Sequence, residues 1–171
     1  GLKTRVTGIE LMEALIRKAK RVMLVGGKGK TADKAAETLK RSILLRYEIL
    51  GVEGIRDVSN PDKNEEERLM EQIKEFKPDL LLVGLGAPWQ EKWAHRQLRS
   101  LGGQVKVVMV VGGALDQIAD PSLRPPRWLD SMGLGWFYRL LREPWRWRRQ
   151  LRLVKFGWMV VFARVRPLFN E

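Results

Sequence analysis

The feature that most constrains this chain is a repeated order of apolar run, glycine turn and helical pattern. Three apolar runs end in glycines, at Gly26-Gly27, at Gly84 and at Gly112-Gly113. Alternating strands and helices with short links are typical of a parallel sheet that is covered on both faces. The sequence therefore predicts the α/β class, with an open parallel Rossmann-like sheet of about four strands flanked by helices.

Helix and strand signals place the expected elements. Thr7 and Glu10 form a capping-box pattern. Asn60 is the expected N-cap of a helix with Pro61 in its first turn, and Lys77-Pro78 ends a helical pattern. We expect helices over 8–20, 31–46, 62–76 and 88–100, and strands over 21–25, 48–55, 79–83 and 105–111.

The chain changes character from residue 120 onward. Prolines 121, 125 and 126 predict a linker, and helices are expected over 134–142 and 144–164. Residues 124–171 hold eleven Lys and Arg against three acids, and five of the seven tryptophans. An apolar face with basic flanks is typical of an interfacial helix on an anionic membrane. The expected membrane-facing residues are Trp147, Leu151, Val154, Trp158 and Val161.

Composition excludes several classes of site. The chain has no cysteine and a single histidine, His95, so disulfides and thiolate metal sites are ruled out and a histidine-built zinc site is not expected. No signal peptide is visible, and no apolar run approaches the ~20 residues that span a bilayer. We expect no metal and no cofactor, and a cytoplasmic protein that is peripheral on the inner face of the membrane.

The stretch 84–93 predicts a binding site. It places a glycine turn and a proline-led helix start after the buried run 80–83, which is where open α/β sheets hold ligands. The stretch 26–31 is not a P-loop. The P-loop pattern would need a glycine at position 24, and that position is a leucine. The pair Gly26-Gly27 also fits a plain turn with no ligand. Asp116 fits two roles equally well: an acid in the first helical turn that the helix dipole favours, or an acceptor for a ribose or uracil.

Several motifs together resemble the WecG/TagA/CpsF glycosyltransferase family. They are the stretches 5–10, 24–27, 84–93, 112–116, 124–128 and 135–144. The resemblance implies inverting, metal-independent transfer of N-acetylmannosamine or a related hexose from a UDP-sugar to an undecaprenyl-diphosphate-linked sugar, in cell-wall or surface polysaccharide synthesis. We expect residues 1–119 to form an α/β nucleotide-sugar-binding domain. Residues 120–171 are expected to form a proline-rich linker and a basic, Trp- and Arg-rich helical membrane appendage.

The resemblance also implies which residues bind. The expected substrate-binding residues are Arg5, Thr7, Gly26, Gly27, Gly84, Gly86, Gln90, Glu91, Gly112, Gly113 and Asp116. The expected diphosphate-binding residues are Arg139, Arg146 and Arg149, since arginine forks suit a diphosphate.

The resemblance does not extend to a catalytic base. Members of the family carry a further segment before the motif that starts at Arg5, and this segment is credited with the base. Little or no transferase activity is therefore expected of these 171 residues, and neither Glu10 nor Glu91 is assigned as the base. The alternative function is a non-catalytic module that binds nucleic acid or membranes. The sequence does not predict the oligomeric state, and a homo-oligomer stays open.

Overall fold

The structure is a computed structural model, and it describes residues 6–27, 29–42, 47–144, 147, 151 and 155–160. By its internal contacts the chain divides into two compact units, Gly1–Pro121 and Ser122–Glu171. We refer to them as unit 1 and unit 2.

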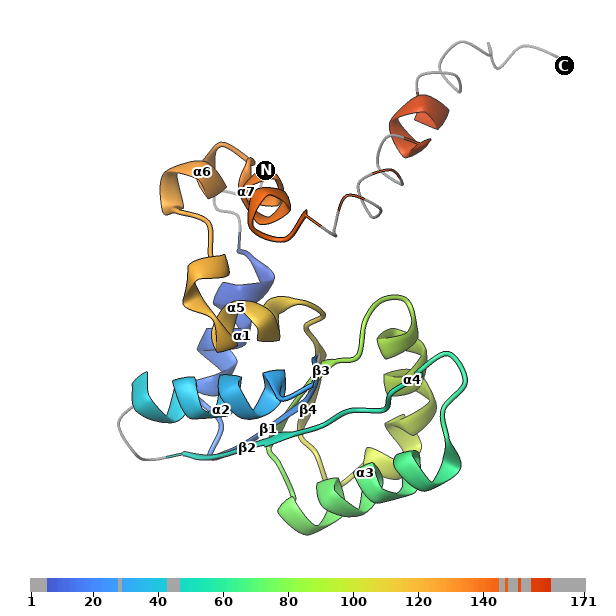
Figure 1. Ribbon diagram of the computed structural model, residues 1–171. Coiled ribbons are helices and arrows are strands. Elements are labelled where there is room, and N and C mark those ends of the chain that lie inside the picture. Colours follow the sequence, from blue (N-terminus) through green and yellow to red (C-terminus); the bar gives the residue numbers. More distant parts are fainter. Residues whose placement is uncertain are drawn as a thin grey trace, which may run out of the picture. The chain divides into compact units, whose positions relative to one another are not determined.

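Unit 1 alternates helices and strands along the chain (Figure 1). Its elements are α1 (Gly8–Ile16), β1 (Arg21–Gly26), α2 (Thr31–Ser42), β2 (Glu48–Val52), α3 (Lys63–Phe76), β3 (Leu80–Gly84), α4 (Trp89–Leu101), β4 (Val107–Val110) and α5 (Ala114–Ala119).

The four strands form one sheet in the order β2-β1-β3-β4, and all three strand pairs are parallel. The predicted open parallel sheet is therefore confirmed. From β1 the chain goes to β2 on one side, whereas β3 lies on the other side of β1. The pair β1–β3 is thus a topological switch point, where open α/β sheets leave a crevice outside the carboxyl ends of the strands.

Helices cover both faces of the sheet (Figure 1). Leu24 and Leu82 lie in a core with residues of α1, α2 and α5, while Val25 and Val83 lie in a second core with residues of α3 and α4. Successive side chains of a strand point to opposite faces. A strand that is covered on both faces must therefore be apolar throughout, which explains the uninterrupted apolar runs in β1 and β3.

Asp79 connects three strands at the amino edge of the sheet. Its Oδ2 accepts hydrogen bonds from the N–H groups of Lys20 and Arg21, both at 3.0 Å, and its Oδ1 lies 2.8 Å from Lys106 Nζ. The bond from Lys106 and then that from the Arg21 N–H hold the pKa of Asp79 below its usual range. The residues that precede β1, β3 and β4 are therefore held together by one carboxylate.

Two element boundaries at this edge differ from the prediction. The helix expected over 8–20 ends at Ile16. Arg17 is its C-cap, the N–H groups of Lys18 and Ala19 both donate to the Leu15 carbonyl, and Lys20 already bonds to Asp79. The strand expected from 105 begins at Val107, because the N–H groups of Lys106 and Val107 both donate to the Asp79 carbonyl. The capping box at Thr7 is confirmed.

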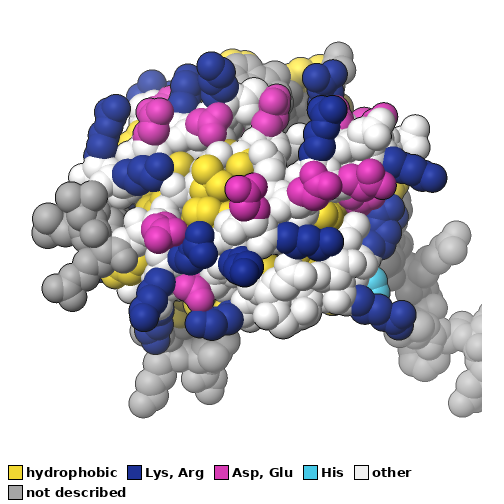
Figure 2. All heavy atoms as spheres, turned by 90° about the horizontal axis from the view of Figure 1, so that it is seen from below, with side chains coloured by type: hydrophobic (Ala, Val, Ile, Leu, Met, Phe, Trp, Pro, Cys, Tyr) yellow, Lys and Arg dark blue, Asp and Glu magenta, His cyan; other side chains and the backbone are white. Residues whose placement is uncertain are grey.

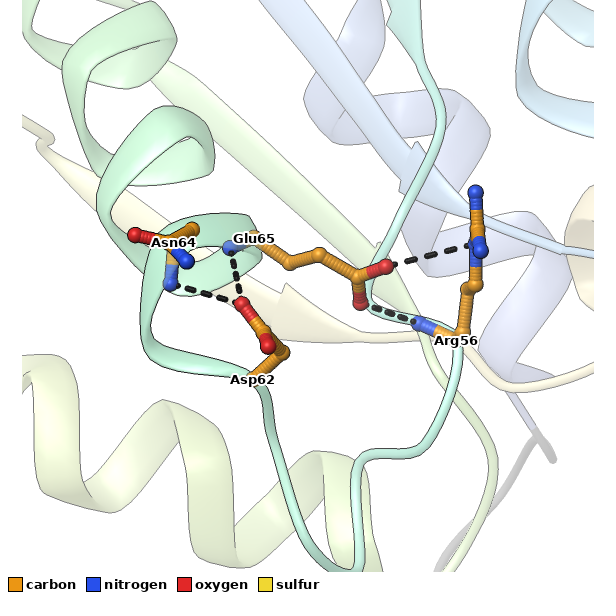
Figure 3. A network of polar contacts seen from close by, with 4 residues as sticks. All are labelled: Arg56, Asp62, Asn64 and Glu65. Atoms are coloured by element: carbon orange, nitrogen blue, oxygen red, sulfur yellow. Dashed lines mark hydrogen bonds and ion pairs between the residues drawn. The ribbon is translucent and has the colours of Figure 1, made fainter.

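The start of α3 differs from the prediction. The carboxylate of Asp62 accepts hydrogen bonds from the N–H groups of Asn64 and Glu65, at 2.8 and 3.2 Å (Figure 3). Asp62 is therefore the N-cap, and the prediction that Asn60 caps this helix was wrong. The Glu65 carboxylate also binds the N–H of Arg56 at 3.1 Å and its Nε at 3.3 Å. The loop between β2 and α3 is thereby fastened to the first turn of α3.

The described part of unit 2 includes the short helices α6 (Arg127–Ser131) and α7 (Gly135–Arg142), and the 3-10 turn η1 (Pro121–Leu123) lies at the unit boundary. The expected proline linker is therefore partly helical, because Pro126 supplies a φ of −54° suited to the start of α6. The helix expected over 134–142 is confirmed as α7. Most of the helix expected over 144–164 lies outside the described residues, although 155–160 are helical. Within the described ranges, no helix has the length and apolar character to cross a membrane.

Candidate functional site

The glycine turns after β1 and β3 meet at the switch point. Gly26 and Gly84 are the last residues of their strands and are partners in the register, and the Gly27 N–H donates to the Gly84 carbonyl at 2.9 Å. β4 ends beside β3, where the Val111 N–H bonds to the Val83 carbonyl at 2.8 Å. The structure therefore brings the three predicted glycine turns to one edge of the sheet.

Two of these glycines are required by close packing. A Cβ on Gly26, which has a φ of +99°, would lie 2.8 Å from the Gly84 carbonyl oxygen. A Cβ on Gly84 would lie 2.6 Å from Leu115 Cδ1. Gly86 differs, because it has a φ of +90° and open space around its α-carbon. Gly26 and Gly84 thus shape the turns, and Gly86 leaves the backbone accessible.

Leu85 fills the space between the ends of β1 and β2. Its Cδ2 would meet a Cβ on Gly26 at 2.9 Å and a Cβ on Gly54 at 2.3 Å. A Cβ on Gly54 would also lie 2.9 Å from the Gly26 α-carbon. The chain after β2 therefore packs directly against the β1 turn, which is why β2 ends at Val52 rather than continuing to 55 as expected.

Gln90 is buried, with 5% of its surface exposed. Its Oε1 accepts from the Gly86 N–H at 3.2 Å, and its Nε2 donates to Glu91 Oε1 at 2.9 Å. A Cβ on Gly112 would lie 3.6 Å from the same Nε2. The predicted binding residue Gln90 thus bonds to the turn after β3, lies next to the turn after β4, and donates to the exposed carboxylate of Glu91.

Trp89 and Lys92 form an exposed pair in the first turn of α4. Trp89 is 40% exposed, and Lys92 Nζ lies 4.4 Å from the centroid of its ring. Sequence reasoning missed this pair. The spacing of three residues on a helix, which places two side chains on one face, is the signal that could have found it.

Gly112, Gly113 and Asp116 form the turn into α5. Gly112 has a φ of +51°, and Gly113 is the N-cap of α5. Asp116 lies in the first turn of this helix and is partly buried. These residues follow β4, so the structure places them at the same sheet edge as the other two glycine turns.

The predicted residues near the start of the chain have other partners. Thr7 Oγ1 accepts from the Glu10 N–H, and Glu10 Oε2 accepts from the Thr7 N–H at 2.7 Å and the Thr7 hydroxyl at 2.9 Å. Thr7 and Glu10 thus serve each other as a helix cap. Arg5 lies outside the described residues.

The predicted residues of unit 2 are described only in part. Arg139 Nη2 lies 2.9 Å from Glu143 Oε2, and these side chains are 16% and 7% exposed. Trp147 and Leu151 are 53% exposed and Trp158 is 64% exposed. The predicted residues Arg146, Arg149, Val154 and Val161 lie outside the described residues. Across the described ranges, no group of three or more His, Asp or Glu side chains could hold a metal ion.

A model of the Glycosyl transferase WecG/TagA/CpsF family matches residues 1–169. The chain belongs to this family. It is similar to the N-acetylglucosaminyldiphosphoundecaprenol N-acetyl-beta-D-mannosaminyltransferase of Bacillus subtilis (strain 168), with 30% identity over 94% of this chain and 60% of the relative. Proteins of the same name from Bacillus spizizenii (strain ATCC 23059 / NRRL B-14472 / W23) and Staphylococcus aureus (strain MRSA252) are 32% and 31% identical, over 91% and 89% of this chain and 58% and 57% of the relatives.

These comparisons confirm the resemblance found in the motifs. The chain spans about three fifths of the length of these relatives. The comparisons do not favour the alternative of a nucleic-acid-binding module. Figure 2 agrees for the face that it shows, where Lys and Arg side chains are interspersed with Asp and Glu rather than gathered into one basic patch.

Proposed function

We propose that unit 1 binds the UDP-sugar donor of an N-acetylmannosaminyl transfer whose acceptor is a sugar linked to diphosphoundecaprenol. The observation that carries the proposal is the meeting of the Gly26-Gly27 and Gly84–Gly86 turns at the switch point of a parallel sheet. Nucleotides bind at such a point in other open α/β sheets. The names of the relatives supply the chemistry of the acceptor and of the transferred sugar.

The chemistry of such a site is electrostatic. An acceptor hydroxyl attacks the anomeric carbon of the sugar, the bond from that carbon to the diphosphate breaks, and UDP leaves with the negative charge. Backbone N–H groups at glycine turns and helix N-termini stabilise an anion of this kind. The turn after β1 leads into α2 and the turn after β3 leads into α4, so the N-termini of these two helices would supply such groups. The Gly27 and Gly86 N–H groups already bond within the chain, to the Gly84 carbonyl and to Gln90 Oε1. The residue that removes the proton from the acceptor is not assigned.

Thermal protection by UDP tests the donor site. A ligand at a hundred times its Kd stabilises the folded state by about 2.7 kcal/mol, which corresponds to roughly 5–10 °C in a chain of this size. We expect millimolar UDP to raise the Tm of the full chain. Failure of millimolar UDP to change the Tm would contradict the donor site.

Two glycine variants provide a matched comparison. Gly86 and Gly103 are both exposed, have φ values of +90° and +81°, and have nothing within 4 Å of an added Cβ. Gly86 lies at the carboxyl edge, whereas Gly103 lies between α4 and β4 at the amino edge. Gly86→Ala and Gly103→Ala should each destabilise the chain by about 1–2 kcal/mol through backbone strain. Only Gly86→Ala should reduce the thermal protection by UDP. An equal reduction in both variants would contradict the assignment of the UDP site to the carboxyl edge of the sheet.

We further propose that the C-terminal part of the chain attaches the protein peripherally to the inner, anionic surface of the membrane. The support is the exposure of large apolar side chains at 147, 151, 156 and 158–160, combined with the basic charge of this region. Buried apolar side chains and nearby Lys or Arg residues each contribute on the order of 1 kcal/mol at such a surface.

Removing residues 144–171 tests the attachment. The shortened chain should lose binding to anionic liposomes in co-sedimentation, and its circular dichroism should show that unit 1 remains folded. High salt should weaken binding of the full chain only in part, because the apolar contribution is not screened. Equal liposome binding by the shortened and full chains would contradict this role, and preferential binding of the full chain to RNA would indicate a different partner.

A further inference from the structure

We propose that Glu53 binds the ribose hydroxyls of the nucleotide, an inference that rests on the proposed donor site. Glu53 directly follows the last residue of β2, and β2 is the neighbour of β1 on the side away from β3. In nucleotide-binding α/β sheets, an acidic residue beyond the glycine turn of the first strand hydrogen-bonds the ribose. Glu53 occupies the corresponding position in this sheet.

Packing places Glu53 beside the β1 turn. Its neighbour Gly54 lies so close to Gly26 that a Cβ on Gly54 would be 2.9 Å from the Gly26 α-carbon and 3.3 Å from the Gly26 nitrogen. A diphosphate held at the N-terminus of α2, which follows the β1 turn, would therefore have its ribose within reach of the residue that precedes Gly54.

The loop that carries Glu53 is fixed by its other acidic residues. The carboxylate of Asp57 accepts hydrogen bonds from the N–H and hydroxyl of Ser59, which hold the pKa of Asp57 below its usual range. Asp62 caps α3, and Glu65 holds Arg56 (Figure 3). Each of these three carboxylates is used within the loop and the first turn of α3, so the loop has a defined course.

Glu53 has no such use. Its side chain is exposed, and within the described part of the chain it makes no hydrogen bond or ion pair. A carboxylate has two acceptor oxygens, which suit the 2′- and 3′-hydroxyls of a ribose. Because 2′-deoxyribose has only one of these hydroxyls, a carboxylate that binds both should distinguish UDP from 2′-deoxy-UDP.

The test compares UDP with 2′-deoxy-UDP by isothermal titration calorimetry on the full chain. We expect the native sequence to bind UDP about tenfold more tightly than 2′-deoxy-UDP, the factor typical of losing one hydrogen bond to a charged group. Glu53→Ala should weaken 2′-deoxy-UDP binding by about tenfold, because its 3′-hydroxyl loses the carboxylate, and UDP binding by about a hundredfold, because both hydroxyls lose it. The preference for UDP should therefore disappear. Glu71→Ala, which removes an exposed carboxylate from α3, is the matched control and should keep the preference.

The outcomes separate this inference from the donor site. If the native chain binds neither nucleotide, the donor site itself is refuted. If it binds UDP but shows no preference, or if Glu53→Ala keeps the preference, the role of Glu53 is refuted and the donor site stands. Loss of the preference in Asp116→Asn but not in Glu53→Ala would place the ribose at the β4 turn and would also overturn the inference.

Discussion

Substituting Asp79 should show how the sheet is held together at the edge opposite the candidate site. Asp79→Ala removes the acceptor of the Lys20 and Arg21 N–H groups, both at 3.0 Å, and the ion pair with Lys106. A hydrogen bond to a charged group contributes about 1.5–3 kcal/mol. The two N–H bonds together would contribute about 3–6 kcal/mol. Because the Lys20 N–H is exposed and can bond to water instead, we expect a total loss at the lower end of that range, about 3 kcal/mol.

The ion pair should account for little of this loss. The side chain of Lys106 is 80% exposed, and pairs of this kind contribute about 0–1 kcal/mol. Lys106→Ala should therefore cost at most about 1 kcal/mol at neutral pH. Asp79→Asn keeps a neutral acceptor and should cost about 1 kcal/mol. Thermal or urea unfolding followed by circular dichroism measures all three, and a Lys106→Ala loss as large as that of Asp79→Ala would refute the reasoning.

The same network predicts a dependence on pH. The folded chain holds the pKa of Asp79 below its ordinary value of 3.8, chiefly through the bond from Lys106. Folding therefore favours the charged form, so its stabilisation is complete above the unfolded pKa and is lost as the pH falls through the lowered folded pKa. Asp79→Asn should lose less stability than the native chain on acidification below pH ~4. An identical loss of stability in the native chain and in Asp79→Asn would contradict the assignment of this pH dependence to Asp79.

Substitutions at one further position in each unit test the packing of that unit. Gly51→Ala should destabilise unit 1 by more than about 2 kcal/mol in urea unfolding, because its Cβ would lie 2.4 Å from the carbonyl oxygen of Ala32 in α2; an unchanged urea midpoint would contradict this packing. Glu143→Ala should lower the thermal stability of unit 2 by about 3 kcal/mol, because it breaks the largely buried pair with Arg139. Glu143→Gln, which keeps a neutral acceptor, should lose less, and equal losses would argue against the ion pair.

The sequence predicted the parts of the fold that depend on local pattern. The apolar runs that end at Gly26 and Gly84 identified β1, β3 and the glycine turns, because strands covered on both faces have no polar positions. The capping box at Thr7 likewise depends on residues three apart. Such features are fully contained in a short stretch of chain.

Contacts between distant residues could not be predicted in this way. Asp79 bonds to the N–H of Lys20 across 59 positions, and this contact joins the entry to β1 to the entry to β3. The burial of Gln90 depends on the turn after β4, which no pattern within α4 indicates. Glu53 lies in a weak strand pattern, and its placement beside Gly26 depends on the order of the strands.

Amide chemical-shift mapping with UDP is the most direct test of the central claim, the nucleotide site at the β1–β3 switch point. Titration of the isotope-labelled full chain should produce its largest changes at the N–H groups of residues 26–27 and 84–86, with smaller changes at 53–54 and 112–113. The amides at the opposite edge, around Asp79 and Lys106, should stay unchanged. Changes confined to that opposite edge or to unit 2, or none at millimolar UDP, would contradict the account.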